Sequence, residues 1–88
     1  MLNVNDKLKV HLYDSRNREI KTRNYDVIFT VYKKDGKLGI NWNTEIQINS
    51  ENVFVPFKSF SHTVIFENVE NGKSYHWDHV KNCIAEIL

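Results

Sequence analysis

Hydrophobic and polar positions form their strongest pattern in the stretch Tyr25–Trp42. From Val27 to Tyr32 the residues are apolar or β-branched at both alternating positions, which is typical of a strand covered on both faces. A turn follows at residues 35–36, which are Asp-Gly, and apolar residues then resume at every second position, namely Leu38, Ile40 and Trp42. The pattern predicts a β-hairpin, with its first strand at about residues 25–33, in the middle of a sheet.

Three other stretches also have the alternation of strands. Lys7–Tyr13 has apolar residues on one face only, so we predict a half-buried strand near a sheet edge. We expect Val53–Phe57 to be a marginal or edge strand, because Pro56 cannot donate a hydrogen bond to a neighbouring strand. His62–Val69 is predicted as the last strand, with alternate residues on its two faces.

Two regions leave alternatives open. Residues 14–24 are polar and turn-like, and short returning strands around Asn17 are compatible with their sequence. Beyond Trp42 the same parity continues through Ile46 and Ile48, as one long bent strand or as two short ones.

After a turn at residues 70–73, the spacing of apolar residues changes from two to the value of about 3.6 that is typical of a helix. On a helix with Ser74 or Asp78 as its N-cap, one side would carry Trp77, Val80, Ile84, Ile87 and Leu88. We therefore predict an α+β fold, in which an antiparallel sheet of about five to six strands carries one C-terminal helix packed on one face. Residues 1–88 are expected to form a single small globular domain.

The composition is that of a globular protein, with 41% hydrophobic and 26% charged residues among 88. Cys83 is the only cysteine and cannot form an intrachain disulfide, which favours a reducing, cytoplasmic location. No apolar run approaches the roughly 20 residues of a membrane span, so no membrane association is expected. The net charge is +1, which is low for a dedicated duplex binder.

Candidate chemistry is sparse. His76, His79 and Cys83 would lie on one flank of a helix that began at Ser74, and imidazole and thiolate are preferred zinc ligands. A structural zinc site needs a fourth protein ligand, and this helix would supply only three. We therefore expect these side chains to lie at the margin of the helix–sheet contact or to face solvent. We find no phosphate-binding loop and no hydrolase or metalloprotease motif. The sequence therefore predicts no metal, no cofactor and no catalytic residues, and it favours a protein that is not an enzyme.

The feature most suggestive of function is a basic segment that holds all three arginines of the chain. Arginine is suited to bidentate contacts with carboxylates and phosphates, and nearby tyrosines could stack on bases or pack against a protein surface. The low net charge favours a protein partner, with RNA or single-stranded DNA as the alternative. The predicted partner-binding residues are Arg16, Arg18, Lys21, Arg23, Tyr13 and Tyr25.

In size, and in its high content of Asn, Lys, Ile, Tyr and Phe, the chain resembles the small accessory proteins of bacteriophages and mobile elements. That resemblance implies a protein-binding inhibitor or modulator, and it transfers no individual residues. We therefore predict a non-catalytic macromolecular binding module, as a monomer or homodimer. The alternatives are an RNA or single-stranded DNA binding protein that uses the segment 16–23 and, third, a small metal-dependent enzyme.

Overall fold

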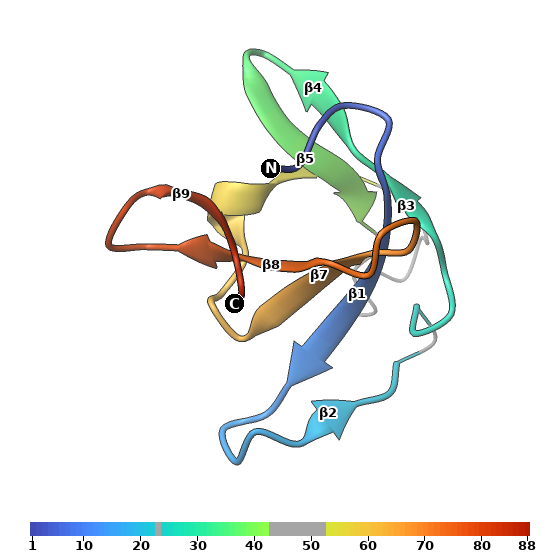
Figure 1. The fold of residues 1–88 in the computed structure, drawn as a ribbon, viewed down its shortest axis with the longest axis vertical. Coiled ribbons are helices and arrows are strands. Elements are labelled where there is room, and N and C mark those ends of the chain that lie inside the picture. The colour runs from blue at the N-terminus through green and yellow to red at the C-terminus, as the bar shows by residue number, and fades with distance from the viewer. Residues whose placement is uncertain (23, 43–52) are drawn as a thin grey trace.

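Two antiparallel sheets share one hydrophobic core in the computed structural model, which describes residues 1–22, 24–42 and 53–88 (Figure 1). The larger sheet has the order β2-β1-β7-β8-β9, and β3 also pairs with β1. Its strands are β1 (Lys7–Tyr13), β2 (Glu19–Ile20), β3 (Phe29–Thr30), β7 (Val64–Asn68), β8 (Ser74–Asp78) and β9 (Cys83–Glu86). The smaller sheet, in the order β4-β5-β6, comprises β4 (Tyr32–Lys34), β5 (Lys37–Trp42) and β6 (Val53–Pro56), and a 3-10 helix, η1 (Phe57–Ser59), follows it.

The centre of the larger sheet is the pair β1 and β7. The predicted strand at Lys7–Tyr13 is confirmed with those bounds, but its predicted place near a sheet edge is wrong, because β1 has β2 and β3 on one side and β7 on the other. It pairs antiparallel with β7 from Leu8 opposite Asn68 to Leu12 opposite Val64. Alternate residues of β1 face the core, and alternate residues of β7 do the same. The strand predicted at His62–Val69 is therefore confirmed in a shorter form, with its expected alternation.

The turn predicted at Asp35 and Gly36 is confirmed. Both residues have positive φ, 52° and 79°, as a two-residue hairpin turn with left-handed central residues requires. The hairpin's predicted place in the middle of a sheet is wrong, because β4 is an edge strand. The predicted strand is also interrupted. Its first part, β3, pairs with β1, while β4 pairs with β5, and the buried Val31 lies where the chain passes between the sheets.

The expectation that the first half of this hairpin is covered on both faces is also wrong. Val27 is 40% exposed and Ile28 is 46% exposed. The chain turns here, since the Tyr25 amide donates to the Thr22 carbonyl oxygen and the Val27 amide donates to the Asn24 carbonyl oxygen. At this point turn hydrogen bonds therefore take the place of the strand pairing that an apolar, β-branched run favours. The predicted continuation through Ile46 and Ile48 lies outside the described residues.

The predicted C-terminal helix, and with it the α+β class, is wrong. Residues 74–86 form the hairpin β8–β9, and the only helical element in the described ranges is η1. In β8, Tyr75 is buried and Trp77 packs against the core, while His76 between them lies on the other face. Trp77 is directly opposite Ile84 in the hairpin, so both face the core as cross-strand neighbours rather than as successive turns of a helix.

The turn of this hairpin explains the misleading sequence pattern. The Oδ1 atom of Asp78 accepts hydrogen bonds from the amides of Val80 (2.9 Å) and Lys81 (3.1 Å). Asn82, at the end of the turn, has a positive φ of 55°. These are the contacts that a helix N-cap would make, but here they close a tight turn. Val80 at the tip is 96% exposed, so the apolar residue that completed the helical spacing does not contribute to the core.

The core between the sheets is rich in aromatic contacts. Phe66 of β7 is fully buried, and its ring meets the rings of Phe57 at 4.8 Å and Phe60 at 5.2 Å between centroids, both in edge-to-face geometry. Trp42 lies edge-on to Phe60 at 5.7 Å and so joins the end of β5 to the same cluster. Within the described ranges, no helix is long and apolar enough to cross a membrane.

Candidate binding face

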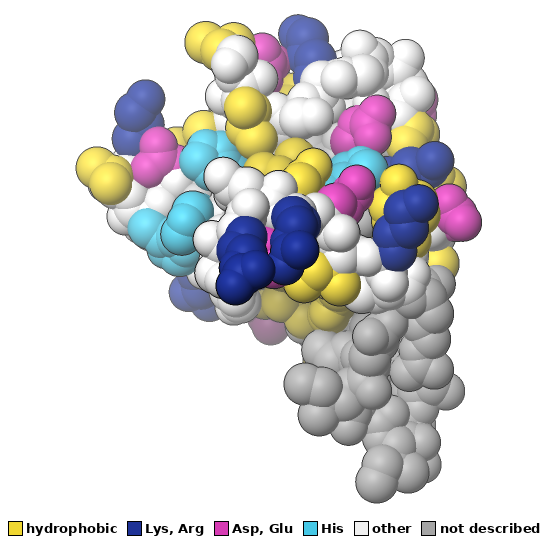
Figure 2. Space-filling model, turned by 90° about the horizontal axis from the view of Figure 1, so that it is seen from below, with side chains coloured by type: hydrophobic (Ala, Val, Ile, Leu, Met, Phe, Trp, Pro, Cys, Tyr) yellow, Lys and Arg dark blue, Asp and Glu magenta, His cyan; other side chains and the backbone are white. Residues whose placement is uncertain are grey.

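The larger sheet has one face on the core, and its other face is open. On the open face β1 presents His11 and Tyr13, β7 presents Ile65 and β8 presents Ser74, because these residues alternate with the buried ones. Figure 2 shows hydrophobic side chains on this side of the molecule between histidines, with Lys and Arg side chains close by. We call this surface the outer face.

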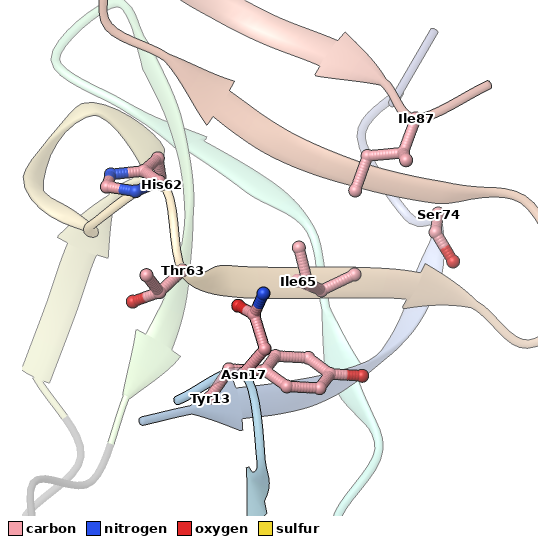
Figure 3. Close-up of a pocket in the computed structure, with 7 residues that line it drawn as sticks. All are labelled: Tyr13, Asn17, His62, Thr63, Ile65, Ser74 and Ile87. Atoms are coloured by element: carbon pink, nitrogen blue, oxygen red, sulfur yellow. The ribbon is translucent and has the colours of Figure 1, made fainter. Parts of the chain in front are cut away.

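A pocket of about 430 Å³ lies on the outer face. Ile65 projects from β7 into its middle, and the amide of Asn17 points toward Ile65 from the β1–β2 turn (Figure 3). The remaining lining comes from the end of β1, the segment before β7, the start of β8 and the residue after β9. The described residues that line it are Tyr13, Asn17, His62, Thr63, Ile65, Ser74 and Ile87.

The lining combines apolar side chains with hydrogen-bonding groups. Two isoleucines supply the apolar surface, and hydroxyl, amide and imidazole groups surround them. Within the described part of the chain, the lining has no acidic and no Lys or Arg side chain. His62 and Ser74 lie at opposite ends of the pocket (Figure 3), so they do not form a nucleophile–base pair. The chemistry of this lining suits an apolar group that is oriented by a few hydrogen bonds.

The arginine-bearing turn is held beside this pocket by Asp14. Its Oδ1 accepts the amides of Arg16 (2.8 Å) and Arg18 (2.9 Å), its Oδ2 lies 3.3 Å from Arg18 Nε, and Asn17 takes a positive φ of 59°. The hydrogen bond from the Arg18 amide, with that from Arg16, holds the pKa of Asp14 below its ordinary value. The same turn therefore brings the Asn17 amide to the pocket and leaves both flanking arginines exposed.

A second cluster on the outer face is centred on His11. Its Nδ1 contacts a carboxylate oxygen of Glu19, and its Nε2 lies 2.8 Å from one of Glu67. The ring of Tyr25 stands edge-on to His11 at 6.1 Å, and the Lys21 ammonium lies 5.2 Å from the Tyr25 ring centroid. Burial alone would lower the pKa of His11, but the hydrogen bonds and charges of both carboxylates outweigh it and raise that pKa.

The structure thus divides the predicted partner-binding residues into two groups. Tyr13 lines the pocket, and Arg16 and Arg18 flank the pocket residue Asn17. Tyr25 and Lys21 pack on each other beside His11. Arg23 lies outside the described residues.

The histidines and the cysteine of the expected helix are rearranged by the hairpin. His76 lies on β8, His79 lies in the turn with its ring 6.5 Å from that of Trp77, and Cys83 begins β9 with an exposed side chain. In the part of the chain that the structure describes, no three His, Cys, Asp or Glu side chains are grouped as metal ligands.

Sequence reasoning missed most of the pocket lining. His62 and Thr63 precede β7, Ser74 begins β8 and Ile87 follows β9, so they come together only through the pairing of β7 with β8 and of β8 with β9. One usable signal was present. Ile65 is a large apolar residue at the parity that faces away from the core, and such a residue on an open sheet face indicates a contact surface.

In comparisons with known proteins, no family model, no curated protein and no solved structure matches the chain.

Proposed function

We propose that this protein is a non-catalytic protein-binding module and that its contact surface is the outer face around Ile65. The observation that carries the proposal is the pocket of about 430 Å³ next to the arginine-bearing turn. An apolar or aromatic side chain of a partner would enter the pocket, and the hydroxyl, amide and imidazole groups of the lining would orient its polar neighbours. Buried anchors of this kind dominate the energetics of protein interfaces.

The arginines beside the pocket indicate which charge the partner surface would carry. Arg16 is exposed, and its guanidinium has no ion-pair partner among residues 1–22, 24–42 and 53–88. Arg18 has Asp14 on one side, so its remaining donors are available. Guanidinium groups pair well with carboxylates, so the partner surface would carry acidic residues beside its apolar anchor. The module would then act as an inhibitor or modulator by covering that surface.

Two observations favour a protein over RNA or single-stranded DNA. The outer face carries the carboxylates of Glu19 and Glu67, which would repel a phosphate backbone. The Lys21 ammonium covers one face of the Tyr25 ring, and His11 stands against the ring as well. Tyr25 is therefore poorly placed to stack on a base. The exposed thiol of Cys83 fits a reducing compartment, and we infer a cytoplasmic setting.

The test is affinity capture from a nuclease-treated lysate of the source cells. The immobilised protein is compared with the variant Arg16→Glu/Arg18→Glu and with the control Lys33→Glu/Lys34→Glu, whose exposed lysines are on β4 of the other sheet. We expect the same proteins to be captured by the wild type and the control and to be lost from the arginine variant.

Equal capture by all three forms would remove the arginine-bearing turn from the contact surface. Loss of all captured material after nuclease treatment would instead favour a nucleic-acid partner. A second variant, Tyr13→Ala, tests the pocket without changing a charge, and we expect it to weaken capture at least tenfold if its ring contacts the partner's anchor.

A further inference from the structure

A second pocket, of about 300 Å³, opens where three separate segments meet at one end of the core. The β4–β5 turn, the start of η1 and the tip of the β8–β9 hairpin each supply part of its wall. The apolar part of the lining comes from both sheets and consists of Leu38, Pro56, Phe57, Trp77 and Ile84. Its volume is at the small end of the range of ligand sites, which runs from about 300 Å³ upward.

The charges of this lining have a single sign. Lys37 and Lys58 both line the pocket, and among residues 1–22, 24–42 and 53–88 no acidic side chain does. A side-chain hydrogen bond with Lys37, and then repulsion between the two charges, lowers the pKa of Lys58. In the adjoining β8–β9 turn, the carboxylate of Asp78 accepts the amides of Val80 and Lys81. An anion between the lysines would relieve their repulsion.

We propose that this pocket binds a small amphipathic monoanion, an aromatic carboxylic acid about the size of two fused rings. The ring system would lie against Trp77, Leu38 and Ile84, and the carboxylate would lie between Lys37 and Lys58. The apolar wall selects for the aromatic rings, because it makes no favourable contact with a fully hydrated anion. The two lysines select for the carboxylate, because they repel a cation.

This site is independent of the outer face. Its strand residues Trp77 and Ile84 face the core side of the β8–β9 hairpin, whereas Ser74 and Ile87, which line the first pocket, lie on the opposite face. Among the described residues, none lines both pockets. Failure of the partner-capture experiment would therefore leave this proposal standing, and the reverse also holds.

The proposal is tested by titrating the protein with 1-naphthoate and, in parallel, with 1-naphthylmethanol, a neutral analogue of similar size. The readout is the set of ¹H–¹⁵N chemical shifts. For naphthoate we expect saturable shifts at the amides of Gly36 and Cys83 and at the indole N–H of Trp77. The alcohol is expected to bind at least tenfold more weakly.

Matched variants separate the two halves of the site. Lys37→Gln/Lys58→Gln is expected to bind naphthoate no more tightly than the alcohol, while Lys9→Gln/Lys33→Gln removes the same charge elsewhere and is expected to retain wild-type affinity. As a second readout, naphthoate should slow the reaction of Cys83 with a thiol reagent, because that residue lines the pocket.

Three results would overturn the proposal. They are the absence of saturable shifts with naphthoate, equal affinity for the acid and the alcohol, and shifts confined to the first pocket at Tyr13 and Ile65.

Discussion

The Nε2 atom of His11 lies 2.8 Å from a carboxylate oxygen of Glu67 on the neighbouring strand β7. The other ring nitrogen contacts Glu19 on β2, so one imidazole joins three adjacent strands of the larger sheet. The His11 side chain is only 17% exposed, which limits competition from water. When the ring is protonated, both nitrogens donate and both carboxylates accept, so the link is strongest in the charged form.

Stability is therefore expected to fall as pH rises from 6 to 9. The two carboxylates raise the pKa of His11 in the folded protein, so the folded state holds the proton more tightly than the unfolded chain does. The stabilisation is complete below the unfolded pKa of about 6.5. It is lost as pH rises through the higher pKa of the folded state. Urea unfolding midpoints across this range provide the measurement.

The control for this experiment is His11→Gln, which keeps hydrogen-bonding capacity but cannot be charged. Its unfolding midpoint should be lower than that of the wild type at pH 6, and the difference should shrink toward pH 9. A constant difference across the range would show that protonation of His11 does not contribute.

Gly39 on β5 has no room for a side chain. An added Cβ would meet the carbonyl oxygen of Val55 and lie 2.8 Å from the Phe54 ring, both on the paired strand β6. We expect Gly39→Ala to reduce the free energy of unfolding by about 3 kcal/mol, the upper end of the cost of overpacking. Gly36 is the control, because space around it is open and asparagine tolerates its positive φ. Gly36→Asn should cost less than about 1 kcal/mol.

The C-terminal hairpin is tested by a charged substitution at Val80. On the predicted helix this residue would face the sheet, but in the hairpin it is 96% exposed. Val80→Asp should change the free energy of unfolding by no more than about 0.5 kcal/mol. By contrast, Phe66→Ala should cost about 3–5 kcal/mol, because the Phe66 side chain is fully buried among aromatic rings. A large loss at Val80 would contradict the hairpin.

Asp14 is expected to keep the arginine-bearing turn closed. Asp14→Ala removes the acceptor of the Arg16 and Arg18 amides, so hydrogen exchange at these two amides should accelerate and partner capture should weaken. Exposed Asp26 provides the control, since Asp26→Ala should leave exchange in the turn unchanged. Because the folded pKa of Asp14 is lowered, the closed turn should persist at neutral pH and loosen only as pH falls through that pKa.

The parts of the fold that sequence reasoning predicted are those fixed by short-range chemistry. The strand β1 has uninterrupted alternation, and Asp35 and Gly36 suit the left-handed turn that they form. The C-terminal hairpin was missed because its tip, with Val80 and the capping contacts of Asp78, imitates the start of an amphipathic helix. Only the pairing of Trp77 with Ile84 decides between the two, and that pairing is a property of the whole sheet.

Among the residues that the structure groups on the outer face, only those close in sequence could be associated with one another in advance. Tyr13 and the arginines around Asn17 are close in sequence, so their association needs only one turn. Ser74 and Ile87 reach the same pocket through strand pairing, which alternation alone does not specify. The packing of Tyr25 and Lys21 beside His11 likewise depends on where the chain returns after β2.

The pairing of β1 with β7 has a consequence for how the chain reaches this fold. It joins residues 8–12 to residues 64–68, and every strand of the smaller sheet lies in the interval between them. Closing so long a loop is slow, whereas the β4–β5 hairpin needs only neighbouring residues. During refolding the β4–β5 hairpin should therefore gain protection early, and the edge of β1 that pairs with β7 should remain open until β7 joins it.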